Sequence, residues 1–129
     1  MNRVVVTGIG IVSSLGNNQQ EVKESLYHTK SGISFDEDQK KMGFRSCVSG
    51  QIKIDLENSI ERKFLRFMGD GASYNYLSML EAIKDSNLSE DEISNNKTGL
   101  IMGSGGPSTK SLLRAFDITR EKGPKKIGP

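Results

Sequence analysis

Two short apolar runs, each followed closely by glycines, constrain the fold of this chain more than any other feature. Residues 3–7 (RVVVT) are mostly β-branched and show no alternation of polar and apolar side chains, and residues 98–102 (TGLIM) form a second apolar run. Uninterrupted runs of this kind are typical of strands that are buried on both faces of a sheet. The sequence therefore predicts two interior strands, one at each end of a mostly polar stretch.

The glycines after the first run, Gly8 and Gly10, raise the question of a dinucleotide-binding loop. That fingerprint needs a third glycine, a helix that starts at the loop, and an acidic residue about 20 positions further on, at the end of a strand. Ser13 occupies the third position, the next helix signal comes only at Asn17, and Asp36 lies in the polar segment FDEDQKK. We therefore interpret the glycines as a tight turn after a buried strand.

The second glycine cluster, GSGGPSTKS, resembles a phosphate-binding loop only superficially. A Walker loop has glycine directly before its Lys-Ser/Thr pair, whereas Thr109 precedes Lys110, and Pro107 removes one of the backbone donors that would hold a phosphate. We expect the glycines of residues 103–106 to let the backbone approach a neighbouring strand or a narrow ligand closely. A nucleotide-binding module is thus the weakest of the functional hypotheses.

Helical signals fill most of the chain between and after the two runs. Capping residues, the i, i+4 spacing of apolar side chains and the capping-box pattern SEDE mark the expected boundaries. The GDG at residues 69–71 reads as a break, and residues 33–54 contain short strand-like pieces, RSCVSG and QIKID, around the polar loop. Helices are predicted from Asn17 or Asn18 to about His28, over 72–85, from Ser89 and over 108–120, and a short amphipathic piece over 61–68.

The C-terminal part of the chain is basic. Its last 20 residues hold six basic and two acidic side chains, whereas the rest of the chain holds 12 basic and 14 acidic ones. A basic end of this kind favours an acidic partner, and a merely solvated basic surface is the alternative. A second, smaller cationic face is expected over residues 61–68, where Arg62, Lys63 and Arg66 point outward while Phe64 and its apolar neighbours face inward.

Composition excludes several classes of site. One cysteine and one histidine allow neither an internal disulfide nor a zinc site of Cys and His ligands, and a lone cysteine fits a reducing cytoplasm. The chain contains no apolar stretch of membrane-spanning length and no signal peptide. We therefore expect a cytoplasmic protein that binds no metal and has neither a membrane nor a nucleic acid as partner.

Four segments together resemble a known family. VTGIGIVSSLGNNQQEV, RKFLRFMGD, GLIMGSGG and KGPKKIGP are similar, in this order and at nearly unchanged spacing, to the N-terminal part of the bacterial β-ketoacyl-acyl-carrier-protein synthases, most closely the type I condensing enzymes of fatty acid synthesis. The resemblance covers the whole chain. It implies that TGIGIVSSLG is a first core strand with its turn and binds no dinucleotide.

The resemblance also implies a fold and an activity. The family has a thiolase-like α/β fold with α/β/α/β/α layers and works as a homodimer. Its acyltransferase reaction, a decarboxylative Claisen condensation of an acyl thioester with malonyl-acyl-carrier-protein, uses a cysteine and two histidines that lie beyond residue 129. Residues 1–129 are therefore expected to be a truncated, inactive N-terminal portion. A non-catalytic fragment that binds the carrier protein or dimerises is the alternative.

Site residues follow from the same resemblance. The family meets the strongly acidic acyl carrier protein with a basic patch, and Arg62, Lys63 and Arg66 match its first part, while Lys122 and Lys125 match its second. The phosphopantetheine arm arrives on the carrier protein, so no cofactor of the chain's own is expected.

The resemblance further places the glycine segment beside the acyl chain. Gly105 and Gly106 match positions near the acyl pocket at the dimer interface. Pro107 stands where a further glycine is common, and Leu112 and Leu113 replace a more polar stretch, so the preferred chain length is left open. No residue of the chain is expected to be catalytic.

The remaining predictions concern two single residues and the stability of the chain. Cys47 is expected to be a small buried apolar residue, and His28 a surface residue at a helix end. Without the strands that should pair beside residues 4–7 and 100–102, apolar faces and sheet edges are left uncovered, so we expect an isolated chain of these residues to be poorly soluble or partly unfolded.

Overall fold

The structure is a computed structural model that describes residues 3–128. Within these residues it consists mainly of helices, with one antiparallel pair of two-residue strands. In that pair Ser34 lies opposite Ser49 and Phe35 opposite Val48. The elements are α1 (Gln19–Tyr27), β1 (Ser34–Phe35), α2 (Glu37–Lys41), β2 (Val48–Ser49), α3 (Leu56–Ser59), α4 (Arg62–Leu65), α5 (Asp70–Ser86), α6 (Glu90–Ile93), α7 (Thr109–Lys122) and the 3₁₀ helix η1 (Pro124–Lys126).

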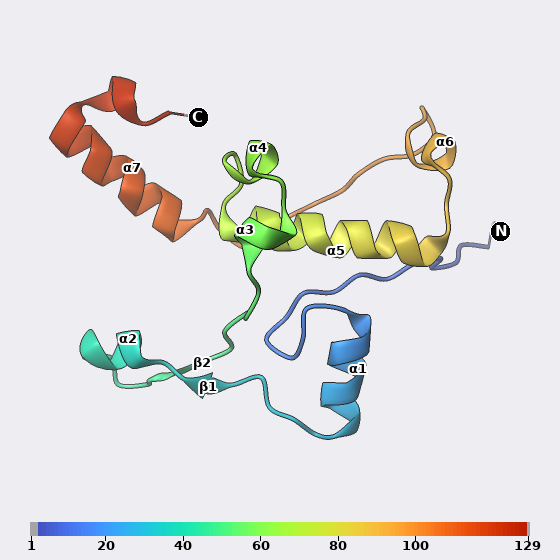
Figure 1. The fold of residues 1–129 in the computed structure, drawn as a ribbon, viewed down its shortest axis with the longest axis horizontal. Helices are drawn as coiled ribbons and strands as arrows, with labels where there is room; N and C mark the ends of the chain where they lie inside the picture. The colour runs from blue at the N-terminus through green and yellow to red at the C-terminus, as the bar shows by residue number, and fades with distance from the viewer. Residues whose placement is uncertain (1–2, 129) are drawn as a thin grey trace.

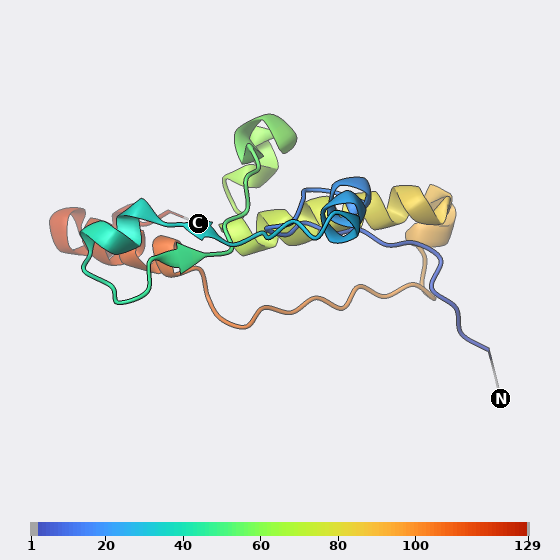
Figure 2. The ribbon, with the colours of Figure 1, turned by 90° about the horizontal axis from the view of Figure 1, so that it is seen from below.

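Helix α5 is the longest element and lies at the centre of the molecule (Figure 1). Helices α3 and α4 lie on one side of it, and α1 with the β1–β2 pair lies on the other. Helix α7 extends away from the end at which α5 begins. Figure 2 shows that the long connection from α6 to α7 runs back along the whole length of α5.

The three long helices confirm the sequence prediction. Helix α1 follows Asn18, whose side chain accepts a hydrogen bond from the Glu21 N–H at 2.9 Å, and it ends at the exposed His28. Helix α7 begins after Ser108, which accepts from the Ser111 N–H in the same way. Short polar side chains favour these positions because they satisfy amides that have no partner inside the helix.

Helix α5 begins earlier than predicted. Asp70 and Gly71 lie inside its first turn, so the expected break at residues 69–71 is wrong. Gly69 is the N-cap, and a carboxylate at Asp70 suits the positive end of the helix dipole. The helix ends at Ser86, one residue after the predicted end, and its C-cap Asn87 adopts the left-handed conformation with φ 58°. The predicted capping box at Ser89 is also present.

Neither predicted interior strand is formed in the structure. Residues 3–7 and 98–102 are extended but make no strand ladder, and their side chains are open to solvent: Val4 is 90% and Ile101 97% exposed. Residues 98–102 run beside α5, which can cover at most one of their faces, whereas residues 3–7 extend beyond the end of that helix (Figures 1 and 2). The prediction of burial on both faces is therefore wrong for the described residues, because a strand needs neighbouring strands to complete its hydrogen bonds.

The predictions for residues 29–54 are also corrected in part. The polar segment FDEDQKK is not a loop, since α2 starts after Asp36, whose carboxylate accepts the N–H groups of Asp38 and Gln39. Only Val48 and Ser49 of RSCVSG form a strand, and QIKID forms none. The turn after α1 is made by Thr29, which has φ 51°.

Most of the apolar surface lies open. Val22 and Ile60 are the fully buried apolar side chains of the described residues, and Phe64 and Phe67 are exposed where inward-facing positions were predicted. The surface area is 11004 Å², against about 6,800 Å² for a compact monomer of this mass. Cys47 is half-buried. The chain is thus a mixed, mostly helical part of a domain, and the layered thiolase-like arrangement stays a prediction.

Candidate functional site

Gly8 and Gly10 bring the backbone of the first apolar segment against α5. A Cβ atom built on Gly10 would lie 2.7 Å from the Ala82 nitrogen and nearer still to the Ser78 oxygen. A Cβ on Gly8 would lie 2.7 Å from the Ser86 nitrogen. These glycines are needed for a close approach of backbone to helix, which explains them without a nucleotide.

Two carboxylates of α5 hold the same segment in place. Asp85 accepts the Ile9 N–H at 2.9 Å, and Glu81 accepts the Ile11 N–H at 2.9 Å and the Gln19 N–H at 2.8 Å. Glu81 therefore ties both the extended segment and the first turn of α1 to α5. Sequence analysis missed this role because i, i+4 acidic residues on a helix are more often solvated.

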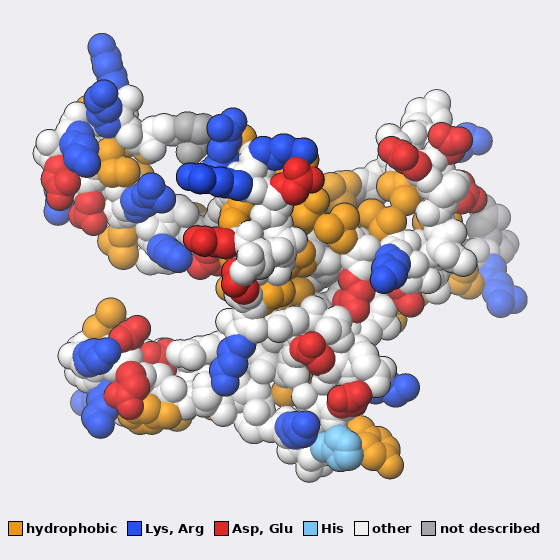
Figure 3. Space-filling model, viewed as in Figure 1, with side chains coloured by type: hydrophobic (Ala, Val, Ile, Leu, Met, Phe, Trp, Pro, Cys, Tyr) orange, Lys and Arg blue, Asp and Glu red, His pale blue; other side chains and the backbone are white. Residues whose placement is uncertain are grey.

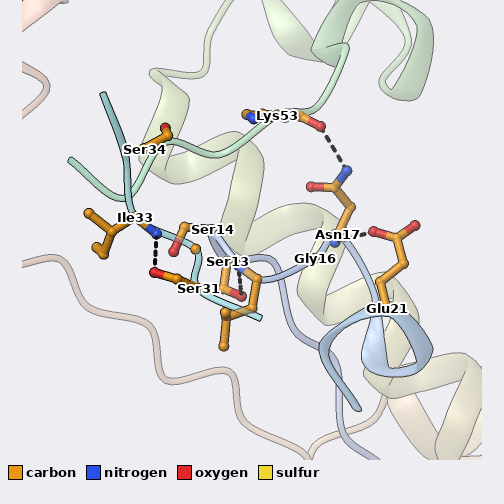
Figure 4. Close-up of a pocket in the computed structure, with 11 residues that line it drawn as sticks. Ser13, Ser14, Gly16, Asn17, Glu21, Ser31, Ile33, Ser34 and Lys53 are labelled. Carbon is orange, nitrogen blue, oxygen red and sulfur yellow. Dashed lines mark hydrogen bonds between the residues drawn. The ribbon is translucent and has the colours of Figure 1, made fainter. Parts of the chain in front are cut away.

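A small polar hollow of about 220 Å³ lies between the turn before α1 and the segment before β1 (Figure 4). Its polar groups form hydrogen bonds mainly with the surrounding backbone. Ser31 accepts the Ile33 N–H at 3.1 Å, and Asn17 donates to the Lys53 carbonyl and, through its backbone N–H, to Glu21, both at 2.8 Å. The hollow is therefore interpreted as a structural junction.

The first part of the predicted basic patch lies on and just after α4. Lys63 pairs with Glu61 at 2.7 Å, and its ammonium group also lies over the Phe64 ring. The Arg66 guanidinium lies over the Phe67 ring, 4.4 Å from its centre. Arg62 and Lys63 belong to the helix itself and Arg66 is its C-cap. The exposed aromatic rings thus support the cations at this surface.

The second part of the predicted patch lies at the end of α7 and in η1. Lys122 ends α7, Gly123 with φ 83° turns the chain, and Lys125 follows in η1. The chain then returns toward α4 (Figure 1). Figure 3 shows Lys and Arg side chains gathered over α4 and along α7. The structure therefore brings the two predicted halves of the patch to the same side of the molecule.

A groove of about 760 Å³ lies between the end of α4 and α7, and of the predicted patch residues Arg66 lines it. One wall is formed by the end of α4 and the chain to α5, and the other by α7 and the segment after η1. Arg114 of α7 lines this groove, and sequence analysis gave it no role. The available signal was its i, i+4 spacing from Lys110 in a basic helix, which does not reveal the wall that α4 provides.

The predicted acyl-pocket glycines lie in the open chain before α7. A Cβ on Gly105 or Gly106 would meet nothing within 4 Å, so neither glycine is required by a close approach in the described residues. A mostly apolar hollow of about 500 Å³ lies next to this segment. It is lined by Met68, Ala72, Asn75, Tyr76, Met79, Leu100, Met102, Gly103 and Ser104.

Hydrogen bonds and burial shift the pKa of some side chains away from their ordinary values. The Gln39 N–H, followed by the side chains of Gln51 and Ser49, holds the pKa of Asp36 below its usual value. Burial, followed by the charge of Asp70, raises the pKa of Tyr74. The single cysteine, Cys47, donates to the Phe44 carbonyl at 3.4 Å.

The described residues form neither a cluster of metal ligands nor a membrane-spanning helix. Between residues 3 and 128 no three His, Cys, Asp or Glu side chains come together as metal ligands would. None of the helices in that range has the length and apolar character needed to cross a bilayer.

Comparisons with known proteins give a consistent result. The family model for the beta-ketoacyl synthase N-terminal domain matches residues 1–128. Over its whole length the chain is 50% identical to the 3-oxoacyl-[acyl-carrier-protein] synthase 1 of Haemophilus influenzae and 48% identical to that of Escherichia coli K12, and it spans 32% of each. Over 98% of its length it is 30% identical to the 3-oxoacyl-[acyl-carrier-protein] synthase 2 of Vibrio cholerae and spans 31% of that protein.

Proposed function

Because this chain belongs to the beta-ketoacyl synthase family through its N-terminal domain, we propose that it serves a 3-oxoacyl-[acyl-carrier-protein] synthase of fatty acid synthesis. The observation that carries the proposal is the match of the whole chain, at 50% identity, to a synthase 1. The chain spans 32% of the length of these relatives. The proposed activity is therefore that of the whole protein and not of these residues alone.

The reaction joins two acyl groups. A cysteine thiolate attacks an acyl-carrier thioester and releases the carrier thiol. Malonyl-carrier then loses carbon dioxide, and the resulting carbanion attacks the acyl-enzyme, forms the new carbon–carbon bond and expels the cysteine thiolate. Cys47 is half-buried, lies just before β2 and is bonded to a carbonyl, so it does not suit the role of nucleophile. The catalytic cysteine and histidines are therefore proposed to lie in the part of the protein that this chain does not span.

The proposed role of this chain is to bind the acyl carrier protein. Arg62, Lys63 and Arg66 on and just after α4, with Lys122 at the end of α7 and Lys125 in η1, would face the acidic carrier. Exposed ion pairs contribute about 0.2–1 kcal/mol each, so five give about 1–5 kcal/mol, below the ~8 kcal/mol of a micromolar complex. The patch would thus steer and orient the carrier, and the phosphopantetheine arm would add the rest.

The acyl chain is proposed to lie near Gly105 and Gly106. The apolar hollow between α5 and residues 100–104 supports this placement, because it offers apolar walls next to the glycine segment. The chain needs no cofactor of its own, since phosphopantetheine comes with the carrier.

The complete protein is proposed to have the layered thiolase-like fold and to be a cytoplasmic homodimer. The open apolar segments 3–7 and 98–102 support this proposal, because strands from the rest of the protein or a second copy would cover them. A non-catalytic role in carrier binding or dimerisation is the second candidate, and the position of Cys47 favours it for these residues alone.

The experiment mixes the intact protein with acyl-carrier and malonyl-carrier and follows the carrier by mass spectrometry. A 3-oxoacyl-carrier product supports the proposal. If no such product forms although both carrier substrates are intact, the proposal is contradicted. Reversal of Arg62, Lys63 and Arg66 to Glu should raise KM for the carrier and leave kcat nearly unchanged, because the patch binds the carrier before chemistry. Reversal of Lys40 and Lys41 on the distant α2 is the matched control.

A further inference from the structure

The groove between α4 and α7 has a cationic part of its own. Arg66 from the end of α4 and Arg114 from α7 both line it, although they are far apart in sequence. No Asp or Glu lines the groove, and within residues 3–128 neither guanidinium makes an ion pair. The neighbouring Asp70 lines a different hollow and pairs with Lys110 at 3.7 Å. The groove thus carries uncompensated positive charge.

Two helix N-termini meet at the same place. Gly69 and Ser108, the N-caps of α5 and α7, both line the groove, and a Cβ atom on Gly69 would lie 3.0 Å from the Ser108 Cβ. No side chain caps the first amides of α5. The positive ends of both helix dipoles therefore add to the charge of the guanidiniums.

Much of the remaining lining is apolar, and Ser111 of α7 adds a further polar side chain. Leu65 and Met68 form one wall, and Ala115 and Ile118, both half-buried, form the other with Ile127 beyond them. The volume of about 760 Å³ falls within the ordinary range of small-molecule sites, about 300–1,000 Å³. Charge and apolar walls in one space suit a ligand that has an anionic head and an aliphatic tail.

We propose that this groove binds a linear amphiphile with a carboxylate or phosphate head, of which a long-chain fatty acid is the simplest case. Arg66 and Arg114 would hold the head through paired hydrogen bonds, the geometry in which guanidinium recognises both groups. The tail would lie along Ile118 and Met68. Binding of the amphiphile does not depend on the proposed function. Competition between the amphiphile and the carrier protein for Arg66 does rest on the proposed function.

The test measures binding of dodecanoate and of dodecyl phosphate to the intact protein by calorimetry, below their micelle concentrations. Comparison of the two identifies the head that the groove prefers. Dodecanol, which lacks the charge, and acetate and inorganic phosphate, which lack the tail, should each bind at least tenfold more weakly. If dodecanol binds as well as the acids, or the wild type binds neither acid, the proposal is wrong.

Matched variants of α7 locate the site. Arg114→Gln should weaken binding about five- to tenfold, the loss of one exposed charge-assisted contact, whereas Arg120→Gln, on the same helix but outside the groove, should leave it unchanged. Ile118→Asn should also weaken binding, and Leu112→Asn should not. Equal losses for Arg114→Gln and Arg120→Gln would mean general attraction to a basic helix and would overturn the proposal. Normal carrier binding by Arg114→Gln would separate this site from the proposed function.

Discussion

Replacing Gly10 by alanine should detach the first apolar segment from α5. The new Cβ would lie 2.7 Å from the Ala82 nitrogen and nearer to the Ser78 oxygen, and both atoms belong to the backbone of a long helix. Because the backbone of a long helix is rigid, the segment around residue 10 must move away from α5. The hydrogen bonds that Ile9 and Ile11 donate to Asp85 and Glu81, both 2.9 Å, lie on either side of the collision and would lengthen or break.

The expected cost follows from these two effects. Overpacking costs about 1–3 kcal/mol, and a hydrogen bond to a charged group contributes about 1.5–3 kcal/mol when buried. The carboxylates here are partly exposed, and alanine gains about 0.4–1 kcal/mol from a less flexible unfolded chain. We therefore expect Gly10→Ala to lower the free energy of unfolding by about 2–4 kcal/mol.

The assay combines urea unfolding of the intact protein with hydrogen exchange of the Ile9 and Ile11 amides. Gly71→Ala is the matched control, because a Cβ there meets nothing within 4 Å and the residue lies inside α5; it should stabilise the protein by about 0.5–1 kcal/mol. If Gly10→Ala unfolds at the same urea concentration as the wild type and keeps both amides protected, the close approach has been misread.

Two further predictions concern helix caps. Asn18→Ala removes the acceptor of the Glu21 N–H and should destabilise α1 by about 0.5–2 kcal/mol, measured by urea unfolding with the exposed Lys23→Ala as control; no loss would contradict the capping role. The folded pKa of Asp36 lies below its ordinary value of 3.8 because the Gln39 N–H donates to it, so its stabilisation of α2 is present above that value and is lost as the pH falls through the lower folded pKa. The hydrogen-exchange rate of the Gln39 amide, relative to that of an unprotected amide, should rise over that acid range, and Asp36→Ala should abolish this pH dependence. If the Gln39 amide shows the same pH dependence in Asp36→Ala, the assignment is refuted.

The sequence predicted local structure better than long-range structure, for a physical reason. The cap at Asn17 or Asn18, the capping box at Ser89 and the helix start near Ser108 depend on neighbours a few residues away, and the structure has Asn18, Ser89 and Ser108 as N-caps. The two apolar runs were predicted to be buried strands, but strand pairing and burial depend on neighbouring strands that residues 3–128 do not supply.

The candidate site shows the same division. Basic residues around 62–66 and 122–126 can be found by charge alone, and a family resemblance gives them a partner. The groove between α4 and α7 cannot be found in this way, because it also needs the turn at Gly123, which returns the chain toward α4 (Figure 1). Only the structure shows that Arg114 and the N-caps of α5 and α7 line the same groove.

Titration of acyl carrier protein into the intact protein, at low and at high salt, tests the central claim most directly. The account predicts binding that weakens steeply with salt and that is lost when Arg62, Lys63 and Arg66 are all reversed to Glu, since exposed charges are screened by ions. Binding that is indifferent to salt and unchanged by the reversal would contradict it.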